Sequence, residues 1–245
     1  MHGVKRTRLS AEALAAHRKK EEVKLKEYLE LTNDVLTKKK AGDWSHEALN
    51  LTTRLLTANP EFYTIWNYRR DIFTNGIFTE CTPNDINDIL NIDLGLTETF
   101  LRLRPKVYWI WNHRRWCLEH VPDGPEGDVL GWKKENWAME LRTVERMLDA
   151  DARNFLAWDY RRYVLESMPV KKPESNELAY TLCKIESNFS NFSAWHQRSK
   201  VYTSLWEKGL LDKAKNKDEG AKPTWWPETQ KPSLLIPFSL RIRTN

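Results

Sequence analysis

Apolar and aromatic residues recur in four similar segments of this chain. The segments are YTIWNYRR (63–70), YWIWNHRR (108–115), FLAWDYRR (155–162) and FSAWHQRS (192–199). Their central tryptophans, called anchors below, are Trp66, Trp111, Trp158 and Trp195, spaced 45, 47 and 37 residues apart. Counted from each anchor, a leucine stands at −17, a leucine or isoleucine at −10, an aromatic residue at −3 and an apolar or aromatic residue at +7. Agreement at this many positions identifies four copies of one structural repeat.

Each repeat is predicted to form two helices, because the apolar residues before and after position −7 follow helical spacing. The second helix is expected to open at position −7. Asn59, Asp151 and Asn188 at that place are good N-cap residues, whereas Arg104 is not. Proline follows in the first two repeats, which suits a first helical position.

On the second helix, the aromatic residue at −3, the anchor, the arginine at +4 and the residue at +7 fall on one side and are predicted to form a buried stripe. The structural residues expected in this stripe are Trp66, Trp111, Trp158, Trp195, Arg70, Arg115 and Arg162. A single helix pair cannot cover such a stripe, so neighbouring pairs must stack on it. The predicted fold class is therefore all-α, an α-solenoid of antiparallel helix pairs.

The predicted organisation has three parts. Residues 1–40 form a basic helical arm, because they hold 11 Lys/Arg against 6 Asp/Glu and lack Gly and Pro from 11 to 40. Residues 41–206 hold the four repeats, at about 41–80, 81–125, 128–170 and 172–206. Residues 207–245 carry no fifth repeat block and are expected to be irregular or disordered.

Charge and composition exclude several classes of protein. The net charge is +5, all of it in residues 1–40, so the repeats lack the basic stripe of a nucleic-acid-binding protein. The 3 cysteines are far apart and fit neither a disulfide framework nor a zinc site. No apolar run is long enough to span a membrane, and the first residues lack the apolar core of a signal peptide. We expect a cytoplasmic protein.

The chain carries no phosphate loop, GxSxG, HExxH or other common enzyme motif. The residue that departs from the repeat is Lys106, which stands where the other repeats have Glu61, Arg153 and Ser190. A lysine at the opening of a helix, beside unpaired N–H groups, favours an anion. Considered alone, an exposed lysine is most often simply solvated.

The run Pro-Lys-x-Tyr-x-x-Trp-Asn-His-Arg-Arg-Trp at 105–116 resembles the signature of protein prenyltransferase α subunits. The resemblance covers residues 1–206 and recurs in all four blocks. Within the family, the start MHGVKR and the segments 153–162 and 188–191 look most like the α subunit of the type II, or Rab, geranylgeranyltransferase. The α subunit shared by the farnesyl and type I enzymes usually carries Tyr-His where this chain has Phe155 and Leu156.

This resemblance implies a crescent of helix pairs that wraps around a β subunit. The β subunit holds a catalytic Zn²⁺, and geranylgeranyl passes from its diphosphate to C-terminal cysteines of Rab GTPases presented by a Rab escort protein. Lys106 and Tyr108 match α-subunit positions that face the diphosphate. We also consider whether His2 reaches the zinc of the β subunit, because a neutral imidazole is a good zinc ligand.

Two other interpretations stay open at this stage. One is a non-catalytic adaptor of the tetratricopeptide kind, although that family repeats every 34 residues or so and its signature is absent. The other is a truncated isoform that binds its partners without turnover, since family members usually continue beyond the fourth repeat.

Overall fold

The computed structural model describes residues 10–209, which form α-helices and one short 3₁₀ helix and contain no β-strand. The helices are α1 (Ala11–Ala41), α2 (His46–Ala58), α3 (Tyr63–Asn75), η1 (Ile77–Glu80), α4 (Pro83–Leu103), α5 (Tyr108–Glu119), α6 (Gly131–Ala150), α7 (Phe155–Ser167), α8 (Glu174–Ser187) and α9 (Phe192–Glu207). His2 and almost all of the 207–245 segment lie outside the described residues.

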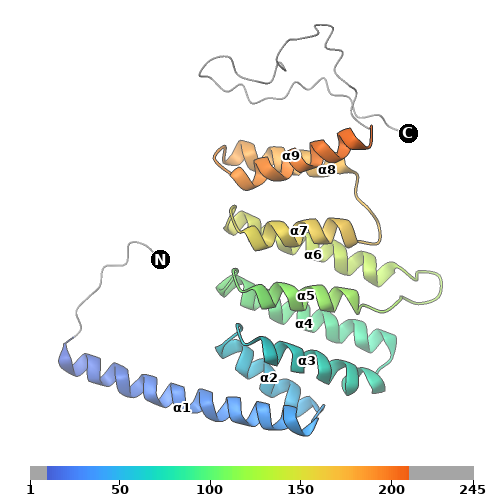
Figure 1. Cartoon of the computed structure of the whole chain (residues 1–245). Coiled ribbons are helices and arrows are strands. Elements are labelled where there is room, and N and C mark those ends of the chain that lie inside the picture. The colour runs from blue at the N-terminus through green and yellow to red at the C-terminus, as the bar shows by residue number, and fades with distance from the viewer. Residues whose placement is uncertain (1–9, 210–245) are drawn as a thin grey trace, which may run out of the picture.

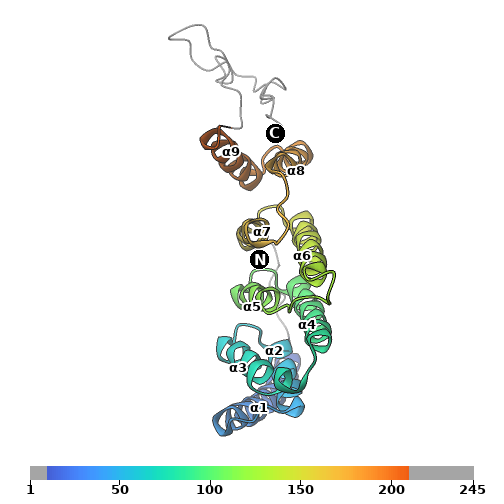
Figure 2. The same ribbon diagram turned by 90° about the vertical axis from the view of Figure 1, so that its right-hand side faces the viewer.

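After α1, the helices pair as α2–α3, α4–α5, α6–α7 and α8–α9, and the pairs stack in chain order (Figure 1). Turned by 90°, α4, α6 and α8 form one layer and α3, α5, α7 and α9 form the other (Figure 2). The predicted all-α solenoid of helix pairs is confirmed.

The first helix, α1, is capped at both ends: the Ser10 hydroxyl before it accepts a hydrogen bond from the Ala13 N–H, and Gly42 after it has the left-handed conformation (φ 68°). Val35 is its one fully buried residue among those described and belongs to the apolar core, and α1 packs against α2. The N-terminal half of α1 extends beyond the stack, past the edge where the turns between paired helices lie (Figure 1).

The prediction that position −7 caps the second helix is wrong. Asn59, Asp151 and Asn188 each follow the first helix as its C-cap, and the second helix begins four residues later. Each of these side chains accepts a hydrogen bond from the N–H two residues on, at 3.1 Å. Asn and Asp favour such turns as strongly as they favour N-caps, so the same residue types gave a misleading signal.

The anchor tryptophans tie these turns to the second helices. In every repeat the anchor indole N–H donates to the carbonyl at −6, at 2.8 to 3.0 Å. Three anchors, Trp66, Trp111 and Trp158, are 0 to 3% exposed, and Trp195 is only half-buried. A tryptophan recurs here because it supplies both a large apolar surface and a donor that reaches the turn.

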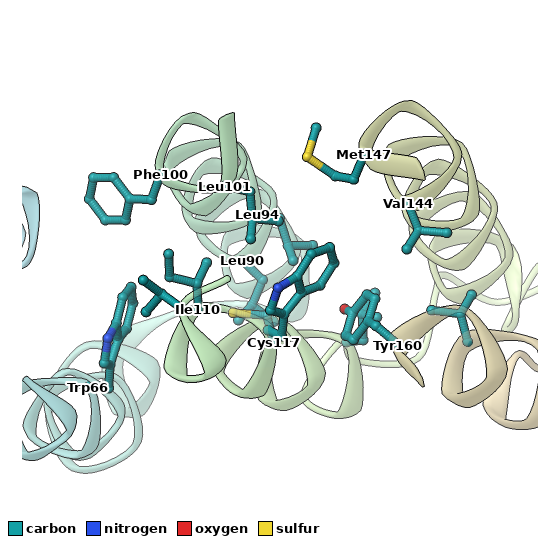
Figure 3. Close-up of a cluster of buried hydrophobic side chains, with 14 of the residues drawn as sticks. Trp66, Leu90, Leu94, Phe100, Leu101, Ile110, Cys117, Val144, Met147 and Tyr160 are labelled. Carbon is teal, nitrogen blue, oxygen red and sulfur yellow. The ribbon is translucent and has the colours of Figure 1, made fainter. Parts of the chain in front are cut away.

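The apolar core runs continuously through the stack rather than forming a separate centre in each pair. Figure 3 shows part of it, with Trp66 of the first repeat facing Phe100 and Ile110 of the second, and Tyr160 of the third on the far side of α5. The ring centroids of Trp66 and Phe100 are 6.2 Å apart, and those of Trp111 and Tyr160 are 4.9 Å apart. Each repeat therefore depends on its neighbour for burial, as in other solenoids.

Buried ion pairs join successive repeats, and they use the arginine at +3. Arg69, Arg114 and Arg161 are 2 to 4% exposed. Their Nε atoms donate across the junction to the carboxylates of Asp93 (3.0 Å), Glu140 (2.7 Å) and Glu177 (3.0 Å). Each carboxylate belongs to position −18 of the following repeat. The arginine at +4, which the sequence analysis placed in the buried stripe, is only half-buried in all three of these repeats.

Three residues meet at each junction: the arginine at +3 of one repeat, and the acid at −18 and the residue at +2 of the next repeat. We call them a junction trio. At the first junction His113 Nε2 lies 2.6 Å from Asp93 Oδ2, and at the third Gln197 donates to Glu177 at 3.4 Å. In the fourth repeat, Arg198 donates to Leu178 O and Thr181, as Arg69 and Arg114 do to the equivalent residues of their own repeats, but no carboxylate of residues 10–209 pairs with it. The trio therefore marks junctions between repeats rather than a property of each repeat alone.

Candidate functional site

One edge of the stack is formed by the turns that join the two helices of each repeat (Figure 1). The aromatic residues at −3 are the first residues of α3, α5, α7 and α9, and all are exposed: Tyr63 53%, Tyr108 54%, Phe155 67% and Phe192 77%. The prediction that they belong to the buried stripe is wrong, because a residue in the first turn of a helix has no preceding turn to cover it. We call these four residues the edge aromatics.

The edge aromatics of the first two repeats form a cluster. The Trp109 ring lies 5.3 Å from Tyr63 and 5.4 Å from Tyr108, measured between centroids. Large aromatic side chains exposed in a row are uncommon on protein surfaces, and they make this edge the candidate site for a ligand or partner.

Lys106 lies next to this cluster, in the turn before α5. Tyr108 is the first residue of the helix and Val107 its N-cap residue, so the prediction that Lys106 opens the helix is wrong by two residues. Its side chain is 64% exposed, and Nζ lies 3.2 Å from Asp151 Oδ2 of the third repeat. The structure thus places Lys106 and Tyr108 on one edge, both reachable from outside the chain.

The turn that carries Lys106 is fixed from two sides. The carbonyl of Pro105 accepts hydrogen bonds from Trp111 Nε1 and from Asn154 Nδ2, each at 3.0 Å. Asn154 is fully buried, and its Oδ1 caps α7 by accepting from the N–H groups of Leu156 and Ala157. The second and third repeats therefore hold the Lys106 backbone jointly.

The arginines at +4 take part in packing between second helices. Arg70 Nε donates to His113 Nδ1 at 3.2 Å, and Arg115 pairs with Asp159 at 2.7 Å. Arg162 pairs with Asp159 as well, at 3.2 Å. Arg70 and Arg115 link neighbouring repeats through these pairs, and Arg162 does so by donating to Gln197 at 3.4 Å; these partners do not include Lys106.

A buried polar cluster at the first junction has the composition of a metal site. Ligand atoms of Asp93, His113 and Cys117 lie within 4.8 Å of one another. However, the Asp93 carboxylate already accepts hydrogen bonds from Arg69. Because an arginine can only donate, His113 Nδ1 must accept from Arg70, which leaves Nε2 as the donor to Asp93. Every ligand lone pair except that of the thiol is already used, so these residues do not fit a metal ion.

Burial and charge set the protonation states in this cluster. Burial lowers the pKa of His113 from 6.5 to about 4, against the opposing effect of Asp93. Burial alone would raise the pKa of the Asp93 carboxyl, but the Arg69 guanidinium and His113 hold that pKa well below its usual range. Burial also raises the pKa of the Cys117 thiol. The result is a neutral imidazole between an anion and a cation, which stabilises the junction and offers no free base.

A cavity of about 340 Å³ lies at the third junction. It is lined in part by Arg161 and Glu177, which pair with each other, and by Tyr180, whose ring lies 3.5 Å from the Arg161 guanidinium carbon. Its central charges are satisfied internally, so it offers less to a ligand than the exposed edge does.

These features define a class of protein, a helical-repeat solenoid with an exposed aromatic edge and one lysine on it. A family model described as "Protein prenyltransferase alpha subunit repeat" matches residues 45–76, 91–121, 137–168 and 174–205, more than half of the chain. The chain belongs to the protein prenyltransferase α-subunit family, as the sequence resemblance predicted.

The most similar curated relatives include "Geranylgeranyl transferase type-2 subunit alpha" from three organisms. The chain is 41% identical to that of Candida albicans, 43% to that of Schizosaccharomyces pombe and 41% to that of Rattus norvegicus, in each case over 84% of its length. The predicted likeness to type II α subunits is confirmed. The chain spans 56%, 57% and 34% of these relatives' own lengths.

Among solved structures, "Candida albicans protein geranylgeranyltransferase-I complexed with GGPP" aligns with 76% of this chain and 72% of its own, at 24% identity and a TM-score of 0.39. Within residues 10–209, no helix combines the length and the apolar character needed to cross a bilayer.

Proposed function

We propose that this chain acts as the α subunit of a heterodimeric geranylgeranyltransferase of the Rab type in the cytoplasm. Its β-subunit partner would hold the catalytic zinc, and a Rab escort protein would present the Rab GTPase. The observation that carries the proposal is the exposed aromatic edge with Lys106 beside it. An edge with aromatic residues more than half exposed is suited to burial against a partner.

The reaction needs a cation near the leaving group. The cysteine sulfur forms a bond to C1 of the geranylgeranyl group, the C1–O bond breaks, and its electron pair leaves on the diphosphate. Zinc supplies a thiolate at neutral pH. Within this chain, Lys106 would bind a diphosphate oxygen and counter the charge that develops there, and the Tyr108 hydroxyl would donate to a second oxygen.

Fixed placement is what makes a single lysine effective. The Lys106 backbone is held by the two hydrogen bonds that the Pro105 carbonyl accepts, so once the side chain has bound the diphosphate, little further reorganisation is needed when charge develops. Loss of one such donor costs about 2.7–4 kcal/mol in the barrier, or roughly 100- to 1,000-fold in rate.

The test is to co-express the chain with a type II β subunit, and to assay transfer to a Rab presented by the escort protein. We expect a one-to-one complex with transfer activity, and a large loss of rate in Lys106→Ala with unchanged subunit association. Lys134→Ala is the control, because Lys134 is also exposed and paired with a carboxylate (Asp128, 3.7 Å) but lies on α6. A complex that forms without transfer would instead support a truncated isoform without turnover.

A separate variant tests the edge itself. Tyr63→Ala and Phe155→Ala together should weaken association with the β subunit while leaving the melting temperature of the isolated chain nearly unchanged, since both side chains are exposed. Unchanged association would contradict the assignment of this edge as the subunit interface.

A further inference from the structure

The ammonium of Lys106 is held by the third repeat and not by its own. Lys106 Nζ and Asp151 Oδ2 are 3.2 Å apart, and the Asp151 side chain is 35% exposed. The other carboxylate oxygen, Oδ1, accepts the backbone N–H of Arg153 at 3.1 Å. One oxygen is therefore used to shape the turn, and this fixes the direction in which the second oxygen faces Lys106.

The backbones of Lys106 and Asp151 are both held in place, and only the Lys106 side chain is long enough to move. Pro105, next to Lys106, is held by Trp111 and Asn154, and the Asp151 N–H bonds to the Met147 carbonyl at the end of α6. Lys106 alone retains a long side chain that can swing. An anion that reaches this edge can bind the ammonium only in competition with Asp151.

We propose that Asp151 is a built-in counterion that exchanges with diphosphate at Lys106. The proposal rests on the function proposed above and concerns the regulation of the same site. When the diphosphate binds, Lys106 leaves the carboxylate for a phosphate oxygen. When pyrophosphate remains after transfer, Asp151 repels it and takes the ammonium back, which speeds its release.

The charge change in Asp151→Asn separates exchange from positioning. Asparagine keeps an oxygen that can accept the Arg153 N–H, so the turn is preserved while the negative charge is lost. If Asp151 competes with the substrate, its loss strengthens binding of pyrophosphate. If Asp151 instead orients Lys106 for the diphosphate, its loss weakens that binding.

The measurement is the dissociation constant of inorganic pyrophosphate for the complex with the β subunit, together with inhibition of transfer by the same ion. We expect Asp151→Asn to bind pyrophosphate about two- to fivefold more tightly, which is the range that an exposed charge pair supports. The gain should vanish in the Lys106→Ala background and shrink at high ionic strength.

Asp149→Asn is the matched control, because Asp149 lies two residues away and pairs with Lys184 of α8. It should leave pyrophosphate binding unchanged. Equal or weaker binding in Asp151→Asn, or a gain that persists without Lys106, would overturn the exchange. A wild-type complex that transfers no geranylgeranyl but binds pyrophosphate with this pattern would refute the proposed function and leave the exchange supported.

Discussion

The junction trios predict that equivalent arginines contribute very unequally to stability. Arg114 is 2% exposed and pairs with Glu140, also buried, across the second junction. Arg198 holds the same position in the fourth repeat, makes the same bonds to its own first helix, and pairs with no carboxylate of the described residues. The two residues share these bonds and differ in the ion pair and in burial, since Arg198 is only half-buried.

Replacing Arg114 with glutamine leaves Glu140 buried without a partner. Removing one member of a buried ion pair costs about 3–5 kcal/mol. For a chain of this size, about 2–4 °C are lost per kcal/mol, so the melting temperature should fall by roughly 6–20 °C. Arg198→Gln removes hydrogen bonds at a half-buried place and should cost about 1 kcal/mol.

The assay is thermal and urea unfolding of the full chain, followed by far-UV circular dichroism. The double variant Arg114→Met/Glu140→Met provides the control, since replacing both members of a buried pair by apolar residues is often neutral. It should recover most of the loss. Equal losses for the two single arginine variants, or no recovery in the double variant, would refute the argument that the ion pair across the junction carries the difference.

Three further outcomes follow from particular contacts. Burial lowers the folded-state pKa of His113 to about 4, so below pH 6.5 the unfolded chain binds a proton that the folded chain does not, and the free energy of unfolding falls between pH 6.5 and 4. His113→Gln should flatten this part of the pH profile of stability. The loss of stability below pH 4 should remain, because it comes from the lowered pKa of Asp93. Gly76→Ala should lower stability by about 1–3 kcal/mol in urea unfolding, because its Cβ would lie 2.4 Å from the Trp44 carbonyl oxygen. Asn154→Ala should cost about 2 kcal/mol in the same assay, since it removes a buried N-cap of α7 and a bond to the turn before α5.

The fold was predictable because the repeat places large apolar residues at fixed distances from each tryptophan. Leu56, Leu101 and Leu148 at −10 are 0 to 1% exposed, and the first three anchors are buried as well. Large apolar side chains that recur at a fixed spacing predict burial directly, because few exposed positions favour them. Family membership followed from the same residues.

The direction in which a side chain points, and the partner it meets there, could not be predicted from residue type in this way. Helical arithmetic places −3 close to the anchor, yet Tyr63 and its counterparts begin their helices and point outwards. The same arithmetic could not choose between the arginines at +3 and +4. One signal was available: the fourth block has Arg198 at +3 and Ser199 at +4, and acids recur at −18 in the second, third and fourth repeats. Asp151 gave no such signal, because its partner lies 45 residues away in another repeat.

The junction trios also bear on how four similar units find their proper order. The acid and the residue at +2 are Asp93 and His113 at the first junction, Glu140 and Tyr160 at the second, and Glu177 and Gln197 at the third. His113 and Gln197 bond to their acids, whereas the buried Tyr160 hydroxyl has no hydrogen-bond partner among the described residues. The acid is shorter only at the first junction, whereas the residue at +2 differs at all three, so the side chain at +2 is what distinguishes one interface from the next. Ala48 occupies the acid's place in the first repeat, where α1 packs against α2. Repeats that resemble one another can exchange partners during folding or between molecules. Because every junction buries an arginine with a carboxylate, charge alone does not tell the interfaces apart; a wrong neighbour would bring a histidine, tyrosine or glutamine into a space shaped for another of the three, and the order of the stack would be favoured by that misfit.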